Sequence, residues 1–203
     1  MKSLSQSIKL SRPFYIILIS FIFVGGVTLS WKMQELRTVE NALAAYGGDF
    51  TLEAPWGKSG LSDYQGKLVL IYFGFASCPD VCPTSLGIMK SALKLLKGSE
   101  QENIAGLFIS IDPERDTPEL TENYAQYFHP SFHGLSGKPE AIAQVAKQYN
   151  VLYKKMDTPE SAMGYTLDHS SVTFLVDQQG VLREKIQHGA TPKEVAEKLR
   201  EYL

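Results

Sequence analysis

The longest uninterrupted apolar stretch of the chain lies near its N-terminus. Residues 13–31 include no charged side chain. A helix of this length would rise roughly 27 Å, close to the thickness of a bilayer's hydrocarbon layer. A cleaved signal peptide is the competing interpretation, but Trp31, Lys32 and Met33 form a poor cleavage site. We therefore predict a tail at 1–12, a retained transmembrane anchor at 13–31 and a linker at 32–48.

The charges that flank this stretch predict its orientation. Lys2, Lys9 and Arg12 precede it, and Lys32 and Arg37 follow it. Because positive residues favour the cytoplasmic side, the bias places the N-terminus in the cytoplasm. In a bacterium, we then expect a single-pass protein of the inner (cytoplasmic) membrane with its C-terminal domain in the periplasm.

Residues 49–203 are predicted to form one domain in which buried strands alternate with amphipathic helices. The apolar runs at 67–75 and 104–111 are typical of strands that are buried on both faces. Apolar residues at helical spacing predict a helix between them: Leu86, Met89, Leu93 and Leu96. Strand–helix–strand order implies parallel pairing of the two strands.

The second half of this domain predicts an antiparallel edge. Helices are expected at 117–128, 141–149 and from Thr191 onward, and strands at 151–155, 172–176 and 181–186. Asp177 to Gly180 is typical of a hairpin turn, and the stretch from Tyr153 to Leu167 is interpreted as irregular. The predicted fold class is α/β, a mixed sheet flanked by helices and compatible with a thioredoxin-like architecture.

Composition excludes several classes of protein. The chain has 20 Lys and Arg against 22 Asp and Glu, a net charge of -2, which offers no basic face to nucleic acid. Hydrophobic residues make up 44%, so wholesale disorder is excluded. With 2 cysteines, the chain is not a scaffold held together by disulfides.

The two cysteines lie where reactive thiols are expected. Cys78 and Cys82 follow a predicted buried strand at the start of a helix. The positive end of a helix stabilises thiolate, so the pKa of Cys78 should be lowered. On one helix face the pair would be separated by about 6 Å of axial rise, which suits a disulfide or a shared metal ion. Thiol–disulfide exchange, a soft metal such as copper(I) or zinc, and a simple structural disulfide all remain open.

One of the four histidines has a distinctive place. His169 lies just before the strand at 172–176, and in a thioredoxin-like fold the residues entering that strand face the cysteines. Thioredoxins carry a cis-proline there, whereas this chain has Val172. We therefore favour Cys78, Cys82 and His169 as three ligands of one metal, with affinity that falls at acid pH.

The remaining polar candidates receive simpler interpretations. Solvated or capping roles are expected for the other three histidines: His129, His133 and His188. Asp80 lies between the cysteines, where it could tune the site or dock a partner. Local ion pairs in a turn are expected for Asp112, Arg115 and Asp116.

Four motifs in the same order resemble the Sco/SenC family of copper-binding assembly factors for cytochrome c oxidase. They are Cys78-Pro79-Asp80-Val81-Cys82-Pro83-Thr84, Ser110-Ile111-Asp112-Pro113-Glu114-Arg115-Asp116-Thr117-Pro118, Phe128-His129-Pro130 and Asp168-His169-Ser170. The resemblance covers roughly Gly47 to Leu203, and the N-terminal anchor matches the family layout. Ala76 stands where many members carry Thr, a departure that affects no ligand.

The resemblance implies both a function and its alternative. It implies a thioredoxin-like domain that binds copper, as Cu(I), Cu(II) or both, through Cys78, Cys82 and His169. Delivery would be to the dinuclear copper centre of the oxidase, with the copper-bearing subunit, other copper chaperones or thioredoxin-like reductants as partners. The alternative is a thiol–disulfide oxidoreductase that reduces the cysteines of that centre, with Cys78 and Cys82 as a redox pair that forms a disulfide when oxidised. A thiol peroxidase has no support beyond analogy of fold.

Overall fold

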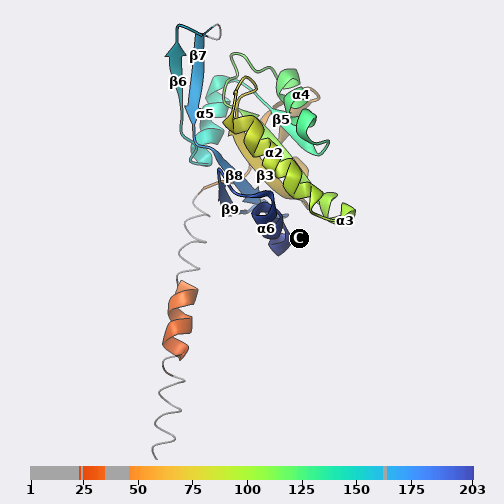
Figure 1. Cartoon of the computed structure of the whole chain (residues 1–203), viewed down its shortest axis with the longest axis vertical. Helices are drawn as coiled ribbons and strands as arrows, with labels where there is room; N and C mark the ends of the chain where they lie inside the picture. Colours follow the sequence, from red (N-terminus) through yellow and green to blue (C-terminus); the bar gives the residue numbers. More distant parts are fainter. Residues whose placement is uncertain (1–22, 24, 35–45, 162–163) are drawn as a thin grey trace, which may run out of the picture. The chain divides into compact units, whose positions relative to one another are not determined.

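A five-stranded mixed sheet lies at the centre of the folded domain (Figure 1). The computed structural model describes residues 23, 25–34, 46–161 and 164–203. The elements in chain order are β1 (Thr51–Ala54), β2 (Gly57–Gly60), η1 (Leu61–Tyr64), β3 (Leu68–Gly74), α2 (Val81–Lys94), α3 (Gly98–Gln101), β4 (Ile104–Ser110), α4 (Pro118–Phe128), β5 (Phe132–Leu135), α5 (Pro139–Gln148), β6 (Tyr153–Thr158), β7 (Gly164–His169), β8 (Val172–Val176), β9 (Leu182–Gln187) and α6 (Pro192–Tyr202).

The order of strands across the sheet is β5-β4-β3-β8-β9. β3, β4 and β5 are parallel, whereas β8 and β9 are antiparallel to their neighbours. This confirms the predicted mixed sheet with an antiparallel edge. Because β8 runs against β3, the end of β3 lies beside the start of β8, and Tyr72 pairs with Thr173.

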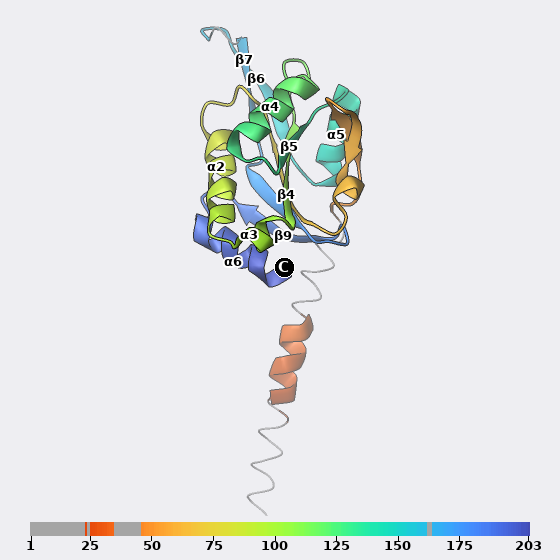
Figure 2. The same ribbon diagram turned by 90° about the vertical axis from the view of Figure 1, so that its right-hand side faces the viewer.

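Helices cover both faces of the sheet, which explains why its central strands are continuously apolar. Every residue of β3 and of β4 is buried. α2 and α6 lie side by side on one face, and α5 lies across the sheet from them (Figure 2). Two helices begin as predicted at a threonine followed by proline, where the Thr117 and Thr191 side chains accept hydrogen bonds from the backbone N–H groups of Leu120 and Glu194.

The stretch interpreted as irregular is a β-hairpin, so that expectation was wrong. β6 and β7 pair with each other along their length, from Tyr153 opposite His169 to Thr158 opposite Gly164. The hairpin extends away from the five-stranded sheet (Figure 1). Its strands are mostly polar and partly exposed, so they lack the apolar alternation by which strands are usually detected.

Cys78 lies outside the helix in which it was expected. α2 begins at Val81, after Asp80 adopts a non-helical backbone, so Cys82 alone of the pair belongs to the helix. Cys78 instead follows a turn in which its N–H donates to the carbonyl of Phe75. The prediction of two thiols on one helix face was therefore wrong, although both sulfurs still follow β3.

The N-terminal segment is a separate unit of the chain. Of the predicted anchor at 13–31, residues 23 and 25–31 are helical, and the helix continues to residue 34. The rest of the anchor, the tail at 1–12 and most of the linker at 32–48 lie outside the described residues. Within the part of the chain that is described, no helix has the length and apolar character that a membrane crossing requires.

A glycine at the end of β3 makes room for the cysteine of α2. A Cβ atom added at Gly74 would lie 2.7 Å from the Cys82 sulfur and 2.9 Å from the Phe108 ring. Both neighbours are buried, so neither can move aside freely. The close approach of Cys82 to the sheet therefore requires glycine at this position.

We expect Gly74→Ala to destabilise the domain by about 1–3 kcal/mol, the usual cost of overpacking a core. Gly87→Ala is the matched control, because a Cβ there meets nothing within 4 Å and lies within α2. It should stabilise the domain by roughly 0.5–1 kcal/mol, since alanine favours the helix. Denaturant unfolding followed by circular dichroism measures both changes. Equal effects of the two substitutions would contradict the close-packing argument.

Candidate metal centre

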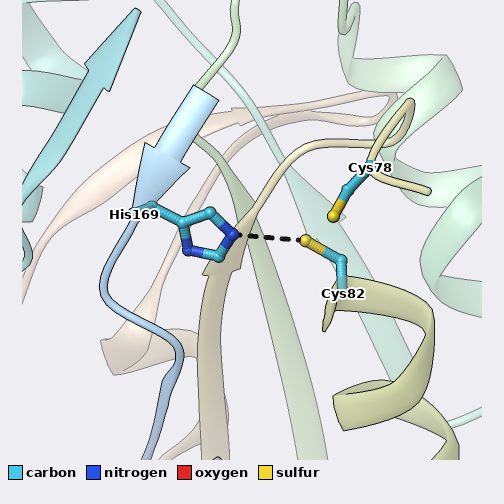
Figure 3. A group of neighbouring side chains, drawn as sticks. All are labelled: Cys78, Cys82 and His169. Carbon is cyan, nitrogen blue, oxygen red and sulfur yellow. Dashed lines mark hydrogen bonds between the residues drawn. The ribbon is translucent and has the colours of Figure 1, made fainter. Parts of the chain in front are cut away.

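Three side chains from separate elements converge at the end of the sheet (Figure 3). Cys78 comes from the loop after β3, Cys82 from the first turn of α2, and His169 is the last residue of β7. The two sulfurs and one ring nitrogen of the histidine all lie within 4.8 Å of one another. Cys82 Sγ and His169 Nε2 are 3.5 Å apart. The structure thus brings together all three residues singled out from the sequence.

The two sulfurs differ in their access to solvent. Cys82 is fully buried at 0% exposure, whereas Cys78 retains 8% and His169 is half-buried. Both thiols are free, with no disulfide between them. An incoming partner or reagent can therefore reach Cys78 before Cys82.

A backbone carbonyl orients the imidazole of His169. Its Nδ1 lies 3.2 Å from the carbonyl oxygen of Ser170, which can only accept, so Nδ1 carries the proton. The Nε2 lone pair then points toward the Cys82 sulfur. The ring packs edge-on against Tyr72 and Phe75, with centroids 6.2 and 6.0 Å away. This arrangement holds a free nitrogen lone pair toward the sulfurs, as metal-binding histidines require.

The pKa values of the two thiols are driven in opposite directions. A hydrogen bond from the Cys82 thiol lowers the pKa of Cys78, with help from the backbone N–H groups of Asp80 and Cys82. The same hydrogen bond and burial raise the pKa of Cys82. Cys78 is therefore the thiolate of the pair, and Cys82 keeps the proton.

Two tyrosines with buried hydroxyl groups near the sulfurs could not be identified from the sequence. The hydroxyl groups of Tyr72 and Tyr124 are buried and have no hydrogen-bond partner among the described residues. Burial raises the pKa of both phenols. Tyr72 lies within the apolar run of β3. Its hydroxyl group was the one feature of that run that could have indicated a polar contribution to the site. The sulfurs thus lie in a poorly hydrated pocket in which electrostatic interactions are strengthened.

The other three histidines contact different partners. His129 lies 2.9 Å from the Ser131 hydroxyl, His133 lies 3.2 Å from the Glu122 carboxylate, and His188 lies 3.3 Å from the Ser85 hydroxyl. None of them belongs to the described cluster that could hold a metal. Asp80 is exposed and takes the N-cap position of α2.

The charged turn at 112–116 supports the cysteine loop. The carboxylate of Asp116 accepts hydrogen bonds from the Ala76 backbone N–H at 2.8 Å and from the Ser110 hydroxyl at 2.7 Å. Asp116 is almost fully buried, and this burial raises the pKa of its carboxyl. The sequence analysis interpreted this turn as local ion pairing and did not predict its contact with the loop.

The donor set fits a soft metal. Two sulfurs bonded to one ion at about 2.3 Å each can be no more than about 4.6 Å apart, so donors within 4.8 Å need little movement to share one. Thiolate and imidazole donors select copper or zinc over hard cations such as magnesium. The same two sulfurs are also close enough for a disulfide after a small rearrangement.

Comparisons with known proteins agree on one family. The SCO1/SenC family matches residues 38–203. A SCO2-like protein of Rickettsia felis is 38% identical over 98% of this chain and 99% of its own length. The solution structure of apo Sco1 from Thermus thermophilus is 41% identical and superposes with a TM-score of 0.71, covering 78% of this chain and 92% of that one. ScoI of Bradyrhizobium japonicum, solved with copper bound, is 40% identical with a TM-score of 0.70, covering 78% and 100%. The fold is therefore the thioredoxin-like α/β architecture of these proteins.

We expect iodoacetamide to modify Cys78 selectively and with little dependence on pH. For an ordinary cysteine the thiolate fraction falls on the order of 100-fold from pH 8 to pH 6. Because the pKa of Cys78 is lowered, its rate should change less than about 3-fold over that range. Mass spectrometry of the modified peptide measures both site and rate. Cys82→Ala removes the hydrogen bond and should restore the steep dependence; a wild-type rate that falls as in a free cysteine would refute the assignment.

Proposed function

The chain belongs to the SCO1/SenC family, and we propose that it is a membrane-tethered copper chaperone that supplies copper to the dinuclear centre of cytochrome c oxidase during assembly. Cys78 and Cys82 act as thiolate ligands, and His169 is the third ligand. The observation that carries this proposal is the convergence of these three donors within 4.8 Å. The partners are the copper-bearing oxidase subunit and, upstream, other copper chaperones or thioredoxin-like reductants.

Two further observations support copper as the cargo. The donors are soft, and a thiolate pair with one imidazole suits both Cu(I) and Cu(II). A relative with 40% identity, ScoI of Bradyrhizobium japonicum, has been solved with copper bound. Binding would displace the proton of Cys82, so the affinity should decrease as the pH falls.

The difference in exposure between the two sulfurs suggests the order in which they would release copper to an acceptor. Cys78 retains a small exposed area, whereas Cys82 has none. A thiolate of the acceptor can therefore replace Cys78 at the metal first, while Cys82 and His169 hold it until the transfer is complete. Exchange with a disulfide of another protein would convert the emptied pair to a disulfide while that protein gains two thiols, and this would withdraw both sulfurs as ligands. A thioredoxin-like dithiol would restore them by the reverse exchange.

Thiol–disulfide exchange is the second candidate function. It is favoured by the lowered pKa of Cys78 beside a protonated Cys82. A pair that exchanges disulfides needs one attacking thiolate, here Cys78, and one resolving thiol, here Cys82. In this case, Cys78 would attack a disulfide in the copper-bearing subunit, and Cys82 would then release the mixed disulfide. His169 would have no essential part in that reaction.

We expect the full-length chain in detergent micelles to bind one copper tightly, with sulfur-to-copper charge-transfer absorption for Cu(II). His169→Ala should weaken binding by at least about 10-fold, because it removes a ligand rather than an outer partner. Cys78→Ser and Cys82→Ser should abolish tight binding and the absorption band. Competition titration with a copper chelator measures the affinities.

His129→Ala is the matched control for this titration, since His129 contacts Ser131 and packs on Phe132. It should leave affinity and spectrum unchanged. An unaltered affinity in Cys78→Ser would disprove the ligand assignment. Weak binding that is indifferent to His169, together with rapid reduction of a disulfide peptide, would favour thiol exchange.

For the segments before the folded domain, we propose a cytoplasmic tail at 1–12, a single transmembrane anchor at 13–31 and a linker at 32–48, followed by the copper-binding domain at 49–203. The absence of charge throughout 13–31 supports the anchor. So does the exposure of large apolar side chains along its described helix, among them Phe23, Leu29 and Trp31. This layout places the domain in the periplasm of a bacterium, at the inner membrane.

We expect the full-length chain expressed in a bacterium to remain in the membrane pellet after alkaline carbonate extraction. A chain starting at Gly47 should be released, because it lacks the apolar segment. Alkaline phosphatase joined after Leu203 should be active only if that end reaches the oxidising periplasm. Release of the full-length chain would contradict the anchor, and an inactive fusion would contradict the orientation.

A further inference from the structure

The hairpin that carries His169 is tied to the charged turn at 112–116 through Tyr165. The Tyr165 hydroxyl donates to Asp112 at 2.8 Å, and Arg115 Nη1 donates to the Tyr165 carbonyl at 3.0 Å. The guanidinium also lies 3.8 Å from the centre of the Tyr165 ring. The turn therefore holds the hydroxyl group, the backbone carbonyl and the aromatic ring of Tyr165.

A second residue of the hairpin strengthens this attachment. Lys155 of β6 forms an ion pair with Glu114 at 2.8 Å, and its ammonium group lies 3.7 Å from the centre of the Tyr165 ring. Burial and the neighbouring Asp112 raise the pKa of Tyr165 to about 12, so the phenol stays a hydrogen-bond donor at neutral pH. Both strands of the hairpin are therefore fastened to the same turn.

The turn contacts the cysteine loop with its other end. Asp116 accepts a hydrogen bond from the N–H of Ala76, two positions before Cys78. Arg115 lies 5.9 Å from the Phe75 ring, which itself packs against His169. One five-residue turn therefore touches both the loop that carries Cys78 and the hairpin that carries His169.

The hairpin is held at two places, near His169 where the chain enters β8 and the Ser170 N–H donates to the Leu152 carbonyl, and near Tyr165 by the turn. Among the described strands, β6 and β7 pair with each other and not with the five-stranded sheet. Tyr165, Leu167 and His169 alternate along β7 and so share one face. Because Tyr165 and His169 belong to the same strand, contacts that hold Tyr165 in place also restrict the movement of His169.

We propose that the 112–116 turn is a clamp that holds His169 at the right distance from the cysteines, with Tyr165 and Arg115 as its positioning residues. The proposal rests on the proposed function, since it concerns the third ligand of the copper site. Neither residue binds the metal. Each acts by reducing the freedom of the hairpin, so that the imidazole is already placed when copper arrives.

The test compares positioning variants in two backgrounds. Tyr165→Phe removes the bond to Asp112 but keeps the ring, and Arg115→Lys keeps the charge but loses the fork that reaches the Tyr165 carbonyl. Each should lower the copper affinity of the full-length chain about 10-fold, as is typical for groups behind a ligand. In a His169→Ala background neither should lower it further, because the clamp acts only through His169.

Thr166→Val is the matched control, since it removes one hydroxyl from the adjacent residue on the opposite face of β7. It should leave the affinity unchanged in both backgrounds. A further 10-fold loss in the His169→Ala background would overturn the clamp in favour of a general effect on folding. Equal effects of Tyr165→Phe and Thr166→Val would overturn it as well.

A measurement without copper separates this proposal from the proposed function. In the metal-free chain, nuclear Overhauser contacts between the rings of His169 and Phe75 should weaken in Tyr165→Phe and persist in Thr166→Val. Persistence of these contacts in Tyr165→Phe would overturn the clamp whatever the copper results. If His169→Ala leaves copper affinity unchanged while the contacts respond as expected, the ligand assignment fails and the clamp stands.

Discussion

The convergence of Cys78, Cys82 and His169 depends on the antiparallel pairing of β3 with β8. The Tyr72–Thr173 register places the end of one strand beside the start of the other. The loop leaving β3 carries Cys78, and the residues entering β8 include His169, so the donors meet although they are far apart in sequence. A parallel pairing would separate them by the length of a strand. Burial of every β3 side chain resists any slip of this register.

Two residues of one type acquire different chemistry from their surroundings. Cys82 lies at the start of α2, beside Gly74 at the end of β3, and keeps its proton. Cys78 lies in the loop, receives hydrogen bonds as a thiolate and retains 8% exposure. The site therefore combines one slightly exposed sulfur with one fully buried sulfur, an asymmetry that stepwise metal transfer and thiol exchange would both use.

Sequence reasoning succeeded where a pattern reflects a strong local preference or complete burial. The apolar runs identified β3 and β4, the threonine–proline pairs identified the starts of α4 and α6, and the order of elements predicted the mixed sheet. It failed at the β6–β7 hairpin, whose polar strands carry no core-facing stripe, and at Cys78, where the chain delays its helix until Val81. In both places the backbone also contacts the 112–116 turn, which is distant in sequence, because Ala76 donates to Asp116 and Arg115 donates to the Tyr165 carbonyl.

The candidate donor residues, the fold class and the resemblance to a family could be inferred from the sequence alone, because residue types, burial patterns and motif spacing are local properties. Which groups surround those candidate donors became clear from the folded domain. The opposite pKa shifts of the two thiols depend on burial and on hydrogen bonds that folding creates, and the packing of His169 against Tyr72 and Phe75 joins residues far apart in the sequence. So does the attachment of Tyr165 to the 112–116 turn. Electrostatic and hydrogen-bonding effects act over a few ångströms in space, and distances along the chain do not specify them.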